Sequence, residues 1–468
     1  MTMRPSSVAL AACMIAGMTA ACNSGEPQPP ELQAIRLPTG AKLAPDGAWL
    51  FVANSNLDLQ EQNSTLVAVS LEDLHAGLAA PRPAGAALEA SAPCRWSEPD
   101  AEDRTIVECD PARLIAREHS VQIPSGAGNI ALDLPAGAEG PWRLLVPSSL
   151  ERLTGTPTGM VSWIDVRSER AGIIMDCGQD AAAQCATEYQ VANLLPDTSR
   201  LTVDPLGARV AYLPHLLGGA FTLIDLDGDF GPALAAVREN VLTESTNTQF
   251  FGGFAAAVRP CDPAAAPRST LECTRPLIYV TQRFWPGLRT LSVNPGLKQI
   301  VAFATGLGST QLQDVEKALI GDRPVTGDLA FEDPAGERLL VVHTTPPALS
   351  RIDTSLGPDG DPLDVEVATI PLCRNPNLLA LHQPPGEESL ALVSCYSDSQ
   401  VAVVALATFT AVATLDVEAG PNELVVDHAR RKLYVVHTLA STIGVVELDA
   451  RSPDYLRIIG RVGLASDE

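Results

Sequence analysis

The feature that most constrains this chain is a unit of four short strands at its C-terminal end, residues 423–462. The expected strands are rich in Val, Ile and Leu and are separated by turn residues, at Leu424–Asp427, Leu433–His437, Ile443–Asp449 and Leu456–Val462. Short runs of this composition between turn clusters are typical of β-strands. One four-stranded sheet is too small to bury both of its faces, so the unit needs neighbours of the same kind.

Copies of this unit recur through residues 32–463, and we count seven of them. Each copy begins with a short first strand that leads into a turn, expected at Leu43–Gly47, Ile130–Asp133, Leu201–Pro205, Phe254–Pro260, Leu329–Pro334, Leu378–His382 and Leu424–Asp427. Such a repeat is the sequence mark of a β-propeller, whose closed ring protects the sheet edges. The sequence therefore predicts an all-β fold, a seven-bladed β-propeller of four-stranded blades with disulfide-bearing loop insertions. Six or eight blades are the alternatives.

The repeat resembles that of the YVTN-type β-propeller family. The second strands that carry the resemblance are Leu50–Asn54 and Leu433–His437, and the third strands are Ser162–Asp165, Thr222–Asp225 and Arg351–Asp353. The resemblance extends over nearly all of residues 32–463. It implies blades arranged around a central channel.

The first 22 residues have the pattern of a signal peptide. Arg4 is their only charge, and the apolar stretch from Val8 to Met18 is too short to span a bilayer. The small residues before Cys22 resemble a bacterial lipobox, which implies lipidation of Cys22; plain secretion is the alternative. Residues 23–31 are polar and proline-rich, as in a flexible tether. We expect residues 32–468 to form a single propeller domain. We therefore expect an exported, membrane-anchored lipoprotein of the bacterial envelope, and Asn23 favours the outer membrane.

Eight cysteines follow the signal peptide and Cys22. An even number in an exported chain indicates disulfides formed in an oxidising compartment. The simplest connectivity joins them in sequence order, as Cys94–Cys109, Cys177–Cys185, Cys261–Cys273 and Cys373–Cys395. The first three pairs lie in loop insertions, and the last is expected to join neighbouring units. No spacing typical of a zinc site is present.

Two further expectations concern the ends of the ring and one loop. Leu32–Leu37 and Leu456–Val462 both have the composition of an outer strand, and one of them should complete the last blade. Gln311–Leu319 has the composition of a short surface helix.

Polar residues recur at two positions of the repeat, and we take them as candidate ligand-binding residues at a channel mouth. One set ends the second strands: Asn54, Ser148, His215, Gln282, His343, Cys395 and His437. The other precedes or begins the first strands: Lys42, Asn129, Arg200, Asp328, Asn377 and Asn422. Equivalent positions of a propeller lie at one end of the ring, where binding sites form. The alternative is that these side chains satisfy backbone groups of turns.

An acidic turn contains Asp225, Asp227 and Asp229, which could supply oxygen ligands to Ca²⁺. The turn does not complete an EF-hand loop, because Phe230 and Ala236 occupy the expected glycine and glutamate positions. Asp and Gly are also ordinary turn residues. Apart from this candidate, no cofactor is expected.

Composition and missing motifs narrow the function. The net charge of −24 and the lack of a basic patch argue against nucleic-acid binding. The sequence contains no Gly-x-Ser-x-Gly elbow, phosphate-binding loop or His-Glu-x-x-His motif. We therefore expect a monomeric binding or protein-interaction module without an assignable reaction, which contacts the membrane only through its lipid anchor. A lactonase-like hydrolase with a channel-mouth site and a structural surface-layer component are the alternatives.

Overall fold

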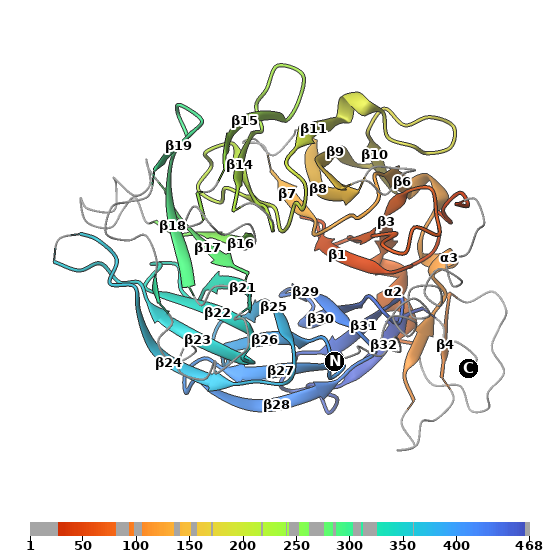
Figure 1. Ribbon diagram of the computed structural model, residues 1–468. Helices are drawn as coiled ribbons and strands as arrows, with labels where there is room; N and C mark the ends of the chain where they lie inside the picture. Colours follow the sequence, from red (N-terminus) through yellow and green to blue (C-terminus); the bar gives the residue numbers. More distant parts are fainter. Residues whose placement is uncertain are drawn as a thin grey trace, which may run out of the picture.

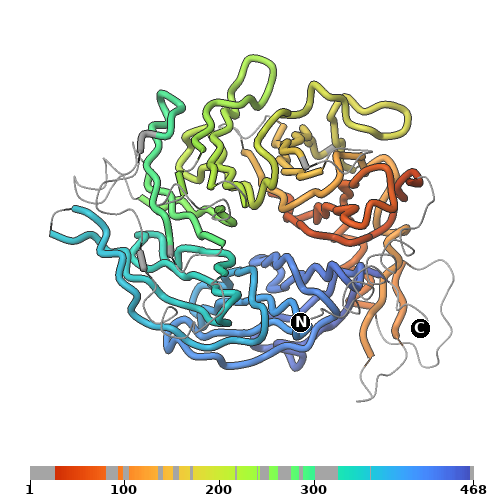
Figure 2. The backbone as a smooth tube through the Cα atoms, in the orientation of Figure 1, coloured from red at the N-terminus to blue at the C-terminus, as the bar shows by residue number. Residues whose placement is uncertain are grey.

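Seven antiparallel sheets stand around a common axis in the computed structural model of the protein (Figure 1). The structure describes residues 27–80, 93–97, 105–134, 141–150, 157–169, 172–216, 219–239, 241–242, 252–261, 276–283, 287–302, 310–311, 325–358 and 360–463. Successive sheets follow one another in sequence order, so the first and the last are neighbours in the ring (Figure 2). The predicted all-β, seven-bladed β-propeller is thus confirmed.

The first strand of every blade lies nearest the axis. These strands are β1 (Pro38–Leu43), β7 (Ala131–Asp133), β12 (Thr202–Val203), β16 (Gly253–Val258), β21 (Val325–Phe331), β25 (Pro376–His382) and β29 (Pro421–Asp427). The second strands are β2 (Trp49–Asn54), β8 (Trp142–Leu150), β13 (Val210–Pro214), β17 (Leu277–Gln282), β22 (Arg338–Thr345), β26 (Leu390–Cys395) and β30 (Lys432–His437).

The third and fourth strands complete each blade outwards. The third strands are β3 (Ser64–Ser70), β9 (Pro157–Glu169), β14 (Phe221–Asp225), β18 (Gly287–Asn294), β23 (Ala348–Asp353), β27 (Gln400–Ala405) and β31 (Thr442–Glu447). The fourth strands are β6 (Ser120–Ile123), β10 (Gly172–Asp176), β15 (Ala233–Arg238), β19 (Gln299–Ala302), β24 (Val365–Pro371), β28 (Thr410–Asp416) and β32 (Ile458–Val462). Two short strands pair outside this order, β11 (Gln190–Leu194) with β9 and β20 (Thr310–Gln311) with β18.

The hydrophobic core lies between adjacent blades. The middle strands are buried on both faces and are therefore continuous apolar runs, such as β26, in which all six residues are buried. Outer strands such as β28 are mostly exposed. One core cluster contains Leu392 and Val403 of the sixth blade with Leu433 and Val446 of the seventh. Burial of this kind is what each blade lacks when it is alone.

Two glycines show how closely the first strands approach one another near the axis. A Cβ atom on Gly40 would lie 2.5 Å from the carbonyl oxygen of Gly128, and one on Gly327 would lie 2.4 Å from that of Asn377. Any side chain at these positions would push the neighbouring blade outwards.

The C-terminal candidate closes the ring. β32 is the fourth strand of the seventh blade, whereas Leu32–Leu37 forms no strand and lies instead against the first blade, where Leu32 and Ile35 are buried. Hydrogen bonds join the first and last blades. Thr438 Oγ1 donates to the carbonyl oxygen of Pro38 at 2.6 Å, and Asn422 Nδ2 donates to that of Thr39 at 3.2 Å.

The insertion in the first blade reaches across to the seventh, which the sequence did not predict. It contains α2 (Leu71–Leu78), β4 (Cys94–Trp96), β5 (Val107–Cys109), α3 (Pro111–Leu114) and the 3₁₀ helix η2 (Arg117–His119). β5 pairs in parallel with β32 and antiparallel with β4, so the last sheet has six strands. In Figure 1 the β4 hairpin projects from the ring beside β32.

The second insertion also carries regular structure. Residues 172–176 form β10, and the 3₁₀ helix η3 (Thr187–Tyr189) precedes β11. Much of this segment therefore belongs to the second blade.

Three of the four expected disulfides are present as predicted, Cys94–Cys109, Cys177–Cys185 and Cys373–Cys395. Cys261 is also disulfide-bonded, and its expected partner Cys273 lies outside the described residues. The last pair joins the segment after β24 to the end of β26 in the next blade, as expected. Disulfides indicate an oxidising, exported environment.

The expected helix at Gln311–Leu319 lies outside the described residues except for Gln311, which belongs to β20. The signal peptide, Cys22 and residues 23–26 of the tether also lie outside them. Within the described ranges, no helix is long and apolar enough to cross a membrane.

Candidate functional site

The residues that end the second strands are packed inside the blades. Asn54, Ser148, His215, Gln282, His343, Cys395 and His437 are at most 2% exposed. None of them is among the residues that line the central cavity. A role for these side chains in ligand binding stays a prediction.

Four of these residues make the same type of contact. Each is hydrogen-bonded to a Ser or Thr hydroxyl of the third strand in its own blade: Asn54 to Thr65 (2.8 Å), His215 to Thr222 (2.8 Å), His343 to Ser350 (3.1 Å) and His437 to Thr442 (3.0 Å). Asn54 and His437 face their partners directly across the ladder, and they bond through Nδ2 and Nδ1 respectively. His215 and His343 reach a hydroxyl farther along the third strand through Nε2. The contacts add a side-chain link between the second and third strands of these four blades.

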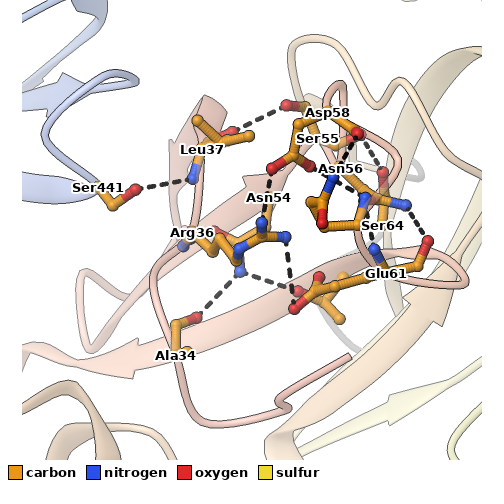
Figure 3. Close-up of polar contacts among 12 residues, drawn as sticks. Ala34, Arg36, Leu37, Asn54, Ser55, Asn56, Asp58, Glu61, Ser64 and Ser441 are labelled. Carbon is orange, nitrogen blue, oxygen red and sulfur yellow. Dashed lines mark hydrogen bonds and ion pairs between the residues drawn. The ribbon is translucent and has the colours of Figure 1, made fainter. Parts of the chain in front are cut away.

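Figure 3 shows how fully the Asn54 side chain is used. Its Oδ1 accepts a hydrogen bond from the Arg36 backbone N–H at 3.0 Å, and its Nδ2 donates to the carbonyl oxygen of Ala34 at 3.0 Å (Figure 3). Arg36 in turn forms an ion pair with Asp58 at 2.6 Å. Asn54 thereby holds the segment before β1 against the first blade.

Burial keeps the buried histidines neutral. Desolvation lowers the pKa of His343 to about 3 and that of His437 to about 4, and it lowers the pKa of His215 as well. For His437, the nearby Glu418 carboxylate opposes this effect without overcoming it. At neutral pH these imidazoles are hydrogen-bonding groups without charge.

Of the three remaining members, Ser148 is buried and its hydroxyl has no hydrogen-bond partner among the described residues, whereas Gln282 and Cys395 are bonded. Gln282 Nε2 donates a hydrogen bond to the carbonyl oxygen of Leu242, and Cys395 is disulfide-bonded to Cys373.

A cavity of about 480 Å³ occupies the centre of the ring, and the first strands form its wall. Most lining residues are aliphatic. The ionisable residues among them are Lys42, Arg200, Asp328, Glu423 and His428. Four predicted residues line this cavity, namely Lys42, Asn129, Arg200 and Asp328.

Glu423 was missed by the sequence analysis, which chose the adjacent Asn422. A spacing could have found it, because in several blades the lining residue stands four positions before an acidic residue that ends the first strand. The pairs are Asn129 and Asp133, Arg200 and Asp204, Asp328 and Glu332, and Glu423 and Asp427.

Arg200 lies between the two carboxylates of the cavity. Its Nη1 and Nη2 donate to the two oxygens of Glu423 at 3.0 and 3.2 Å, and its Nε lies 3.8 Å from Asp328 Oδ1. Burial alone would lower the pKa of Arg200, but Glu423 and Asp328 outweigh it and hold that pKa above its usual value. Bidentate geometry of this kind fixes both side chains.

Lys42 differs because its ammonium group has no hydrogen bond or ion pair with any described residue. Its side chain is exposed to the solvent of the channel. The surrounding blades nevertheless lower its pKa by desolvation, and the charge of Glu423 opposes that change while the charge of Arg200 adds to it. The Lys42 side chain is therefore available to a ligand in the channel.

The predicted asparagines join blades to one another. Asn129 pairs with the backbone of Leu201 in the next blade through two hydrogen bonds of 2.9 Å. Asn377 Oδ1 accepts from Arg283 Nη2 at 3.2 Å, and Asn422 bonds to the first blade. Neither Asn377 nor Asn422 lines the cavity.

The acidic turn proposed for Ca²⁺ is partly neutralised by basic side chains. Arg209 Nε donates to Asp227 at 2.9 Å, and Lys298 forms an ion pair with Asp225. Asp229 is exposed at the tip of the turn. No group of three or more His, Cys, Asp or Glu residues that could hold a metal ion occurs within the described part of the chain.

Comparison with known proteins identifies the fold. No protein-family model matches the sequence, and no curated protein is significantly similar to it. Hydrazine synthase of Kuenenia stuttgartiensis is similar in structure, with a TM-score of 0.52 and 12% identity over 92% of this chain and 99% of that one. The periplasmic gluconolactonase PpgL of Pseudomonas aeruginosa gives 0.53 and 12% over 79% and 91%.

The β-propeller domain of Swd1 from Myceliophteria thermophila gives a TM-score of 0.53 and 11% identity over 90% of this chain and 100% of that one. By their names, hydrazine synthase and the gluconolactonase are different enzymes. At these identities, the similarity shows that the chain has the propeller fold.

Proposed function

We propose that this protein is an exported binding module, held at the bacterial envelope through Cys22, whose central channel takes up a small molecule with an anionic group. Lys42 carries the proposal. It is the cation of the channel wall that has no partner among the described residues, whereas Arg200 is held by Glu423.

The rest of the channel supports binding of a small ligand. A volume of about 480 Å³ lies within the range of ligand sites in proteins, and an aliphatic wall with a few fixed charges is typical of them. The charged residues come from four different blades, so their arrangement depends on the closed ring. Hydrogen bonds already tie Arg200 and Asp328 in place before any ligand arrives. A preorganised site of this kind loses little entropy on binding.

Isothermal titration calorimetry with small carboxylates and sugar acids tests this proposal. We expect at least one of them to bind, and Lys42→Met to weaken it by about tenfold or more, which corresponds to about 1.4 kcal/mol. Lys42→Arg keeps the charge and should restore most of the affinity. Arg374→Met, at an exposed arginine that pairs with Asp398 away from the channel, is the matched control.

Two outcomes would contradict the proposal. One is an affinity that does not change in Lys42→Met, and the other is the absence of binding across the panel. Steady hydrolysis of a lactone by the wild-type protein, lost in channel variants, would instead support the lactonase-like alternative.

A further inference from the structure

We infer that the ligand of the channel is a zwitterion of the α-amino acid type, with a carboxylate bound at Lys42 and an ammonium group bound at Asp328. This inference rests on the proposed function and specifies its ligand.

The first argument is the balance of charge around the cavity. Two cations, Lys42 and Arg200, and two carboxylates, Asp328 and Glu423, line the same small space. Their formal charges sum to zero. A ligand with only a negative charge would meet two carboxylates in this small space, and like charges at close range repel each other. A dipolar ligand of zero net charge can satisfy both signs.

The second argument is that one group of each sign can still form further hydrogen bonds. Arg200 and Glu423 engage each other through two hydrogen bonds. Asp328 accepts the backbone N–H of Leu329 at 3.0 Å and that of Leu379 at 3.3 Å, while Arg200 Nε is 3.8 Å away, beyond hydrogen-bonding distance. Because a carboxylate can accept about four hydrogen bonds, Asp328 can take further donors.

The position of Asp328 strengthens this argument. It is 8% exposed and lines the cavity, so any new donor must come from within the channel. Its two backbone hydrogen bonds come from two adjacent blades, and they fix the carboxylate without neutralising it. An ammonium group with three donors fits such an acceptor.

The third argument concerns the body of the ligand. Three aliphatic residues that line the cavity, Leu132, Leu381 and Val425, are only half-buried, whereas Ile130, Leu201 and Leu329 pack in the cores between blades. An apolar side chain that covers the three half-buried residues gains about 25 cal/mol per Å² of covered surface. Amino acids with aliphatic side chains should therefore bind better than glycine.

Three matched compounds separate the two recognition groups. L-leucine carries both charges, N-acetyl-L-leucine only the carboxylate, and L-leucine amide only the ammonium. Calorimetry with the wild-type protein should show leucine binding, and each blocked compound should bind at least tenfold more weakly.

Two variants should exchange these preferences. In Lys42→Met, leucine should lose its advantage over leucine amide, because the carboxylate has no partner. In Asp328→Asn, leucine should lose its advantage over N-acetyl-leucine. The asparagine Oδ1 can accept only one of the two backbone N–H groups, those of Leu329 and Leu379, that donate to separate oxygens of Asp328. The unfolding midpoint of each variant is therefore the control for retention of the fold.

The results on the wild-type protein decide the inference even if a variant fails to fold. Equal binding of leucine and N-acetyl-leucine would overturn the zwitterion and leave an anion site, in agreement with the proposed function alone. Failure of leucine, valine, alanine and phenylalanine to bind at 10 mM would also overturn the inference. If carboxylates without an amine then bind in a Lys42-dependent way, only the ligand class is wrong; if nothing binds, the proposed function fails as well.

Discussion

Two sets of polar residues recur around the ring, one at the ends of the second strands and one on or just before six of the seven first strands, and the structure places most of their members in different environments. The set that ends the second strands is buried, and four of its members bond to the third strand of their own blade, as His437 does to Thr442. Four members of the set on the first strands, including Lys42 and Arg200, line the central cavity. The same sequence signal, a polar residue at a fixed place in the repeat, therefore has two meanings. The position of its strand relative to the axis decides which meaning applies.

The comparison shows that, in a propeller, repetition of a polar residue does not by itself mark a binding site. A second strand is covered on both faces by neighbouring blades, so its polar side chains are shielded from water and most of them are hydrogen-bonded within the protein. A first strand has the channel on one side and can leave a charged group available. Asn129, however, uses its side chain to join two blades, so the set on the first strands also contributes to the stability of the fold.

The largest expected effect tests whether Arg200, a member of the set on the first strands, also stabilises the fold. Arg200→Met removes the partner of Glu423, which is 7% exposed, and leaves a nearly buried carboxylate without compensation. We expect the free energy of unfolding to fall by about 3 kcal/mol, as when one member of a buried ion pair is removed. Urea denaturation followed by tryptophan fluorescence measures the change. The double variant Arg200→Met with Glu423→Gln should recover part of the loss, and no recovery would contradict this explanation.

The next effect concerns the buried set of residues that ends the second strands. Asn54→Ala leaves the Arg36 N–H and the Thr65 hydroxyl without their partner, which should cost about 1–3 kcal/mol. Hydrogen exchange should also become faster in residues 31–37, because Asn54 holds that segment. The exchange rates of the seventh blade outside its contacts with the first serve as the internal control. An unchanged exchange rate at residues 34–37 would show that Asn54 does not hold the segment.

The third prediction uses pH to distinguish the two sets of polar residues. His437 is neutral in the folded protein, because burial lowers its pKa from 6.5 to about 4, but it takes up a proton when the chain unfolds. The unfolded state therefore binds more protons below about pH 6.5, and the free energy of unfolding should decrease as the pH falls from 6.5 towards 4. One such histidine contributes up to about 1.4 kcal/mol per pH unit.

His437→Asn, which copies the Asn54–Thr65 pair, should make this dependence less steep. Denaturation midpoints measured at several pH values between 4.5 and 7.5 provide the comparison. Lys42→Met is the control and should keep the wild-type slope. An equal slope in His437→Asn would mean that this histidine is protonated in the folded protein.

The smallest expected effect belongs to Lys42. Because Lys42 has no hydrogen bond among the described residues, Lys42→Met should change the free energy of unfolding by less than about 0.5 kcal/mol. The same urea titration as for Arg200→Met measures it. If Lys42→Met lowered the free energy of unfolding as much as Asn54→Ala does, the two sets of polar residues would not differ in their contribution to stability.

The architecture was readable from the sequence because each blade repeats the same local pattern. Runs such as Leu433–His437 are apolar on both faces, and the turns between them are short, so strands and their order follow directly. The ring closure by β32 could be narrowed only to two segments, since both had the composition of an outer strand. The pairing of β5 with β32 could not be predicted, because its partners are far apart in sequence and neither has a distinctive pattern.

The candidate site was predicted in part. Lys42, Arg200 and Asp328 were identified as charges at the start of the first strands, and the structure brings them together with Glu423. The choice of Asn422 over Glu423 shows the limit of such reasoning, because a shift by one residue exchanges the two faces of a strand. Burial of the histidines depends on neighbouring blades, which no local pattern encodes.

The strand pairing between β5 and β32 has a consequence for the synthesis and the degradation of the chain. Glu108 and Arg461, which bond across this junction, are 353 residues apart. Contacts of such separation form late, so an edge synthesised early stays open until the C-terminal end has emerged. This strand pairing must also break before the outer strands of the last blade can unfold. Shortening the chain by its final strand should therefore expose both ends of the ring together and make the nascent protein a target for proteases.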